Sequence, residues 1–263
     1  GDFRVTGESL TLNGALTTGG LMSIDATSLS VNAALQATGS GDSVDLRAVT
    51  TLGGDITTNG GSIFLREAVT LASSVTLDTG SGGVVRFNYE LDSASGQNYG
   101  ITINAGDEGI NFARALGGVQ RLGAIKIISA SSVTVGTGRA VNATSIEQVA
   151  GTGTTSFGGV VSTTGQIGAG NLNGIDITTN KVRFKQNVTT TNAGAVRVAN
   201  ASTLTIDDGA NFSVAGKFEQ VGGGSTVLGG NIVTSNADIS FASGVTLGQD
   251  VSLDTGAGAG DID

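Results

Sequence analysis

Short triplets in which two apolar residues flank a polar one recur along the whole chain. Examples are Leu10-Thr11-Leu12, Val75-Thr76-Leu77, Val133-Thr134-Val135 and Val196-Arg197-Val198. Successive side chains of an extended strand point to opposite faces, so this period of two predicts strands with one buried and one wet face. Turns rich in Gly, Asn, Asp, Ser and Thr separate most of the triplets. We therefore predict an all-β protein of short strands.

Larger units also repeat. Residues 52–82 align without a gap on residues 228–258, and 15 of these 31 positions are identical. A short strand cannot bury its apolar face alone, so repeated strands must stack and share one core. We predict that residues 1–263 form one continuous, elongated parallel β-helix (β-solenoid). With about 20 residues per coil it has roughly 13 coils and a length of about 60 Å at the usual strand spacing.

The duplication makes a local prediction about its turns. Gly53 and Gly54 in the first copy match Gly229 and Gly230 in the second. We expect these glycines to lie at equivalent corners, at least one of each pair with a positive φ that other residues rarely adopt.

An array of immunoglobulin-like sandwiches is the rival architecture, because it too has short strands at regular spacing. Its domains normally contain bulky core aromatics, and this chain has no Trp, two Tyr and nine Phe. The solenoid is therefore favoured over the sandwich array.

The absence of proline supports a backbone whose N–H groups are needed for sheet ladders, because proline removes a donor. The chain also lacks Cys and His, which excludes disulfides and thiolate or imidazole metal sites. Its net charge is −9 with only 13 Lys and Arg, so nucleic acid is not an expected partner. No apolar run approaches the length that spans a bilayer, so we predict no membrane span in this segment.

Several acids are candidates for Ca²⁺ ligands, and turn chemistry explains each of them as well. The stretch from Gly39 to Asp45 resembles a single calcium-binding glycine–aspartate turn, whereas such sites need ligands from successive coils. Two other turns place paired acids beside a glycine. The calcium candidates, against the plain corners that we favour, are Asp42, Asp45, Asp107, Glu108, Asp207 and Asp208. We predict no cofactor.

No catalytic residue is predicted. The chain has no His, and its acids show no spacing that would flank a scissile glycosidic bond. We therefore predict that the protein is not an enzyme. Its threonines drift in register along the sequence, which argues against a regular ice-binding array.

The texture of the repeats resembles a known group of proteins. Residues 69–80, 101–106 and 157–165 are similar to repeats of very large bacterial surface proteins, the filamentous-haemagglutinin-like adhesins and autotransporter passengers. The resemblance covers nearly the whole chain and rests on repeat texture. It implies a right-handed parallel β-helix, an extracellular or cell-surface location, and a role in adhesion or in a surface filament.

These observations predict a structural segment of a bacterial surface fibre, sheath or adhesin stalk. The alternative is an adhesive module in which one solenoid face recognises a glycan or another cell-surface partner. Neither end of the sequence shows a polar cap, so we expect either a window of a longer array or a protomer that stacks head to tail with further copies.

Overall fold

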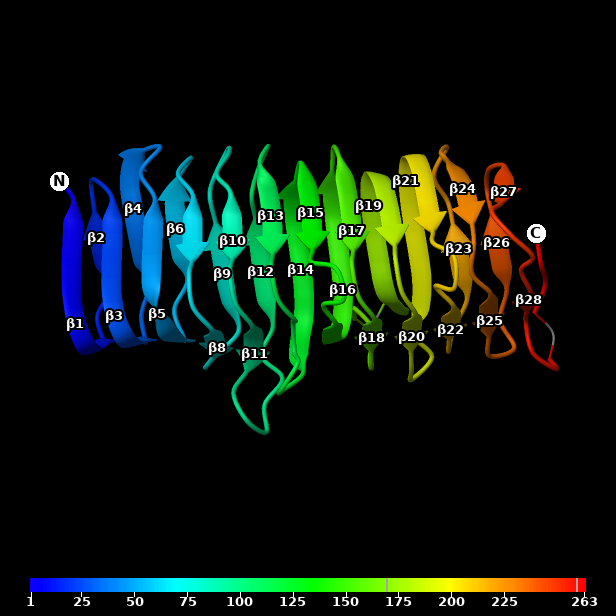
Figure 1. The fold of residues 1–263 in the computed structure, drawn as a ribbon, viewed down its shortest axis with the longest axis horizontal. Coiled ribbons are helices and arrows are strands. Elements are labelled where there is room, and N and C mark those ends of the chain that lie inside the picture. The colour runs from blue at the N-terminus through cyan, green and yellow to red at the C-terminus, as the bar shows by residue number, and fades with distance from the viewer. Residues whose placement is uncertain (169, 259) are drawn as a thin grey trace.

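The computed structural model describes residues 1–168, 170–258 and 260–263, which form a rod (Figure 1). Every regular element in those residues is a strand, and the named strands pair in parallel over about 12 coils. The predicted all-β solenoid is therefore confirmed. Coil length varies more than expected: equivalent residues recur after 19 positions between Phe3 and Met22, and after 27 between Thr155 and Val182. The described residues include no helix of the length and apolarity that crossing a bilayer takes.

Each coil contributes to three strand ladders, here termed faces 1, 2 and 3. Face 1 contains the first halves of β1 (Phe3–Leu12), β3 (Met22–Val31) and β5 (Val44–Leu52), then β7 (Ile63–Leu65), β10 (Val85–Phe87), β13 (Gly109–Phe112), β15 (Ser132–Val135), β17 (Thr154–Phe157), the second halves of β19 (Asn173–Phe184) and β21 (Ala195–Ile206), β24 (Ser225–Leu228) and β27 (Val245–Leu247).

Faces 2 and 3 share the remaining strands. Face 2 contains the second halves of β1, β3 and β5, then β8 (Val69–Leu71), β11 (Leu91–Ser93), the start of β16 (Val141–Gly151), β18 (Val161–Thr163), β20 (Val188–Thr190), β22 (Phe212–Val214), β25 (Ile232–Thr234) and β28 (Leu253–Asp254). Face 3 contains β2 (Leu16–Thr18), β4 (Leu35–Ser40), β6 (Ile56–Asn59), β9 (Val75–Asp78), β12 (Ile101–Asn104), β14 (Leu122–Ala130), the rest of β16, the first halves of β19 and β21, β23 (Phe218–Gln220) and β26 (Ile239–Phe241).

Strand β10 shows how the triplet pattern builds the core. Val85 and Phe87 are buried and the intervening Arg86 is exposed. Val85 pairs with Ile63 in the preceding coil and Ile110 in the next, so one inward position becomes a column of apolar residues. Burying such side chains contributes about 1.5–3 kcal/mol each, which is the main stabilising contribution in a fold without disulfides.

Aromatic rings stack inside the rod. The rings of Phe87 and Phe112 are stacked with centroids 5.1 Å apart, and those of Phe157 and Phe184 are 5.0 Å apart. Phe212 then meets Phe184 edge-on at 5.1 Å. Both arrangements are favourable for aromatic pairs and stabilise the stacking of neighbouring coils.

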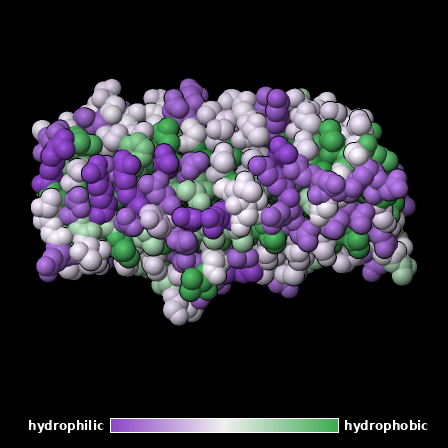
Figure 2. Space-filling model, viewed as in Figure 1, coloured by the Kyte–Doolittle hydropathy of each residue, from purple (hydrophilic) through white to green (hydrophobic). Residues whose placement is uncertain are grey.

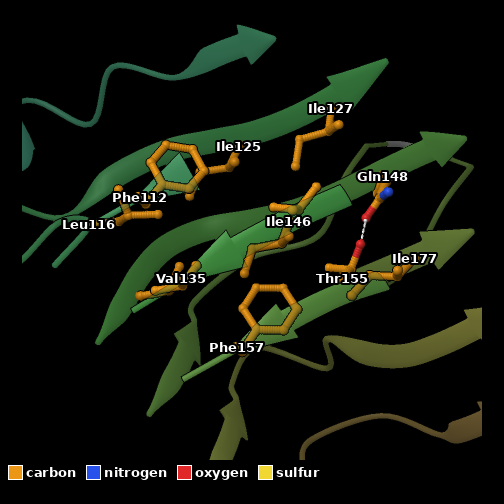
Figure 3. A pocket seen from close by; sticks show the side chains of 12 residues that line it. Phe112, Leu116, Ile125, Ile127, Val135, Ile146, Gln148, Thr155, Phe157 and Ile177 are labelled. Atoms are coloured by element: carbon orange, nitrogen blue, oxygen red, sulfur yellow. Dashed lines mark hydrogen bonds between the residues drawn. The ribbon is translucent and has the colours of Figure 1, made fainter. Parts of the chain in front are cut away.

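The interior also holds buried polar pairs. Thr155 donates a hydrogen bond of 2.6 Å to Gln148, whose side chain lies among the apolar residues in Figure 3. Three coils on, Gln220 donates to the buried Asn200 at 2.8 Å. The void beside Gln148 measures about 10 Å³, close to the smallest space that holds one water. This part of the interior is a packed core and offers no room for a larger ligand.

The prediction about the duplicated glycines is wrong in its mechanism. None of Gly53, Gly54, Gly229 and Gly230 has a positive φ. A Cβ on Gly54 would instead lie 2.1 Å from the carbonyl oxygen of Ala33, one coil away. A Cβ on Gly230 would meet the preceding coil in the same way. These glycines are required by close approach of neighbouring coils.

The two copies of the duplicated segment lie one face out of step. Leu52 ends the face 2 part of β5, whereas the aligned Leu228 ends β24 on face 1. Both side chains are fully buried and both precede a corner. Their corners are therefore on different edges of the rod, and the later strands of the segment are offset by one face in the same way, as with β7 on face 1 and the aligned β26 on face 3.

Candidate functional site: the faces and edges of the rod

Asp45, one of the calcium candidates, forms ion pairs with two arginines. Its carboxylate lies 2.7 Å from Arg66 Nε and 3.0 Å from Arg47 Nη2. Burial alone would raise the pKa of Asp45, but hydrogen bonds from Arg66 and Arg47 together outweigh it and hold the pKa below its ordinary value. The same bond raises the pKa of Arg66. Asp45 is thus engaged in a structural ion pair that links two coils.

The structure does not bring the other acidic candidates together. Asp42 is half-buried, and Asp107 and Glu108 are exposed, at corners between faces 3 and 1 that belong to different coils. Asp207 lies on the edge after face 1, where it accepts hydrogen bonds from Arg183 at 2.8 and 2.9 Å, and its neighbour Asp208 is exposed. Within the residues that the structure describes, no three His, Cys, Asp or Glu side chains are placed to share a metal ion.

Face 3 carries a row of charged side chains in register. Lys126 pairs with Glu147, and Asp176 pairs with Arg197, each at 2.8 Å between neighbouring strands. Exposed ion pairs of this kind contribute about 0–1 kcal/mol each. The row therefore links neighbouring strands of face 3 in register. Hydrophilic side chains form a band along the rod in the view of Figure 2.

Face 2 carries a row of hydroxyl groups. Thr11, Ser30, Thr51 and Thr70 are direct register partners in four successive coils. The sequence order predicts hydroxyl residues that drift in register, whereas these four lie directly opposite one another. The row is a single file that mixes serine with threonine and continues into Asp92. It gives face 2 a flat, polar surface.

Two loops project from the edge between faces 2 and 3 and form a knob. Residues 94–100 and 117–121 belong to neighbouring coils, and the projection is visible below β11 in Figure 1. The Asp92 carboxylate accepts hydrogen bonds from the backbone N–H groups of Val119 and Gln120, at 2.9 and 3.2 Å. The Gln120 side chain donates to the carbonyl oxygen of Gln97 at 2.6 Å. The loops are thus cross-linked, although Val119 is 91% exposed.

Arg121 anchors the base of the knob. Its Nη1 donates to the carbonyl oxygens of Ala143 and Ser162, at 3.0 and 2.9 Å, so one side chain spans two further coils. Burial lowers the pKa of Arg121 without displacing it from the charged state at neutral pH. Arg121 therefore has a structural role, because its hydrogen bonds hold the base of the knob to the next two coils.

A shallow hollow lies beside the knob on face 3. Its lining includes Ser74, Thr76, Asn98, Thr102 and Lys126. These hydroxyl, amide and ammonium groups suit a polar ligand, and no carboxylate lines the hollow. The strand triplets do not indicate this hollow. Its signal was the run of seven residues, Ala94 to Gly100, that interrupts the triplet pattern.

Comparisons with known proteins returned no match: no family model, no curated protein and no solved structure is significantly similar to this chain. The resemblance to bacterial adhesin repeats therefore stays a prediction.

Proposed function

We propose that this chain is a rigid structural segment of an extracellular or cell-surface bacterial fibre, sheath or adhesin stalk. The observation that supports it is the set of parallel ladders from β1 to β28, which on face 2 narrows to the single bridged residue Leu116 between β11 and β16. In a solenoid each coil contacts only its neighbours, so stiffness follows from the continuity of these ladders. The stacked phenylalanines and the inter-coil ion pairs add contacts that a flexible linker lacks.

We also propose that further coils, from the same chain or from other copies, stack on the outer coils of this rod. Val245 and Leu247 on β27 are 39% and 60% exposed, whereas their register partners Thr226 and Leu228 on β24 are fully buried. On the first coil, Phe3 and Leu12 are only half-buried. Unpaired strand edges with apolar side chains are typical sites of strand addition.

Sedimentation of residues 1–263 over a range of concentrations tests this stacking. We expect end-to-end oligomers, seen in electron micrographs as rods lengthened in steps. Leu247→Lys places a charge on the outer edge and should shift the protein to monomer. Val119→Lys adds the same charge to the knob and is the matched control. A wild-type chain that stays monomeric at every concentration would contradict the stacking.

The knob and its hollow favour a second candidate function, an adhesive module. We propose that the hollow on face 3 recognises a glycan of a cell surface, because hydroxyl and amide groups converge there beside an ordered loop. Thr76→Val with Thr102→Val keeps the strand shape and removes two hydroxyls. On an array of cell-surface glycans these changes should abolish binding seen with the wild type. Thr51→Val with Thr70→Val, on face 2, is the control that should leave binding intact.

A further inference from the structure

The cations of this chain fall into two groups. Seven of the 13 form ion pairs, namely Arg4, Arg47, Arg66, Lys126, Arg183, Arg197 and Lys217. Arg121 is bonded to carbonyl groups. The side chains of the other five form no ion pair or hydrogen bond with any residue that the structure describes. These five, here termed the basic strip, are Arg86, Arg114, Arg139, Lys181 and Lys185.

All five residues of the basic strip lie on face 1 or on the edge that follows it. Arg86 is the outward residue of β10, and Lys181 lies in β19 opposite Thr154. Lys185 directly follows Phe184, the last residue of β19. The strip crosses five successive coils, a distance of about 19 Å at the usual strand spacing.

Arg114 and Arg139 occupy equivalent positions in neighbouring coils. Leu116 bridges to Leu91 on one side and to Val141 on the other, and each arginine lies two residues before its bridge partner. The guanidinium of Arg114 lies 5.9 Å from the ring centre of Tyr89, which occupies the same position one coil earlier. Tyr89 is 43% exposed, so an aromatic surface continues the strip.

Like charges on neighbouring strands destabilise a sheet unless a counter-charge is supplied. The chain has more acids than cations, and other arginines near face 1 have a carboxylate as counter-charge. Asp45 pairs with Arg47 and Arg66, and Asp207 pairs with Arg183 beside the strip. Between Val85 and Lys185, Glu90 is the one acid among the described residues of face 1 and its following edge. Like charges on neighbouring strands that have no counter-charge are expected at functional surfaces.

The side chains between the cations are neutral and form hydrogen bonds readily. Asn111, Thr134 and Ser156 are successive register partners that join Arg86 to Arg183 along face 1. Amide and hydroxyl groups of this kind suit sugar hydroxyls, and arginine suits carboxylates. Double-stranded DNA carries a charge about every 1.7 Å, a density that a rod of net charge −9 repels more strongly than a sparsely charged polymer.

We propose that the basic strip binds a linear polysaccharide that carries carboxylate groups, laid along the rod axis. Arg86, Arg114 and Arg139 pair with the carboxylates, and Tyr89 offers its ring to a sugar. This inference goes beyond the structural role and does not depend on it, because a single rod presents the whole strip. It also concerns a different face from the knob.

Calorimetric titration of residues 1–263 with polygalacturonate at low salt tests the strip. The variant R86Q/R114Q/R139Q should lose at least about tenfold in affinity, because charge-assisted hydrogen bonds are lost. The control R4Q/R197Q/K217Q removes the same charge outside the strip and the hollow, and should stay within about twofold of wild type, since it alters only the general field. Circular dichroism and the unfolding midpoint establish that both variants fold.

Four outcomes would overturn the inference. They are an absence of binding at low salt, an equal loss in both variants, equal binding of neutral dextran, and tighter binding of a 20-base-pair DNA duplex (about two turns of helix). The last would reassign the strip to nucleic acid. The two proposals can fail separately. If the chain binds polygalacturonate but never forms end-to-end oligomers, the binding role of the strip is supported and the proposed stacking is contradicted.

Discussion

At the corners, single glycines decide how closely two coils approach. The sequence singles out Gly54 and Gly230 through the duplicated segment, but it predicts a positive φ that the structure does not show. The requirement comes from a carbonyl oxygen about one coil away, Ala33 for Gly54 and Ala210 for Gly230. Local sequence cannot reveal such a contact until the register of the coils is known.

Gly54→Ala should therefore lower the free energy of unfolding by about 1–3 kcal/mol, the range for an overpacked site. The added Cβ would overlap the backbone of Ala33, which cannot rotate away. Gly14→Ala is the matched control, because a Cβ there meets nothing within 4 Å and should change stability by no more than about 0.5 kcal/mol. Urea unfolding of both variants measures the difference, and equal stabilities would contradict the close-approach account.

Asp45 makes a prediction about pH. Its pKa is lowered in the folded chain from the ordinary value of 3.8, so its ion pairs stabilise the fold above that value. The contribution is lost as pH falls through the lowered folded pKa. Asp45→Asn should cost about 1 kcal/mol at pH 7 and progressively less as the pH falls below 3.8. Unfolding midpoints between pH 2 and 7 measure this, with Asp208→Asn at an exposed position as the control, whose cost at pH 7 should stay within about 0.5 kcal/mol.

At the scale of strands, the triplet pattern predicts most of the fold. It does not predict the 12-residue strands β19 and β21, which run unbroken from face 3 into face 1. Their inward side chains at that edge include Thr179 and Asn200, which are buried and bonded to the backbone oxygens of Gly153 and Ser225. Because these inward residues are polar, the alternation of apolar and polar residues does not indicate that the strand continues through them. The sequence also offers Asp45 as a calcium candidate, because its ion-pair partner Arg66 lies 21 residues further along the chain.

The stacked phenylalanines Phe157, Phe184 and Phe212 allow the contribution of core packing to stability to be measured. Phe184 stacks on Phe157 and meets Phe212 edge-on, and it is fully buried. Phe184→Ala should destabilise the rod by about 3–5 kcal/mol, and Phe184→Leu by clearly less, because leucine refills much of the cavity. Phe3→Ala, at a half-buried position of the first coil, should cost less than Phe184→Ala. Urea unfolding ranks the three, and a similar cost at Phe3 would contradict an ordered column.

At the scale of the whole molecule, the ladders give a rod whose length is set by the number of coils. The sequence predicts about 13 coils at a constant ~20 residues, and the structure has about 12 because several coils are longer. The extra residues go to corners and loops, such as the knob, where the face 2 row is reduced to the bridged residue Leu116. Coil count is therefore predictable from the strand triplets, whereas the place of each insertion depends on contacts between coils.

Removing one whole coil tests this architecture. Residues 44–62 carry one complete turn, because Val44 pairs with Met22 before it and Ile63 after it. Their deletion joins Ser43 to Ile63 and brings Met22 opposite Ile63, Val31 opposite Leu71 and Leu35 opposite Leu77, so apolar residues still face one another on all three faces. Only nearest-neighbour contacts are lost, so the shortened chain should remain folded and cooperative. Its maximum dimension in small-angle scattering should fall by about 5 Å, one strand spacing.

Deleting residues 44–53 instead removes about half a coil. This removes the whole of β5, which supplies both face 1 and face 2, so the remaining turn keeps only β6 and the apolar neighbours of two missing strands meet water. We expect this chain to lose its β signal or to aggregate, while the whole-coil deletion keeps the circular dichroism of the wild type. Equal tolerance of both deletions would contradict a solenoid in which each coil must close around three faces. The comparison thus separates a repeating coil from a merely strand-rich chain.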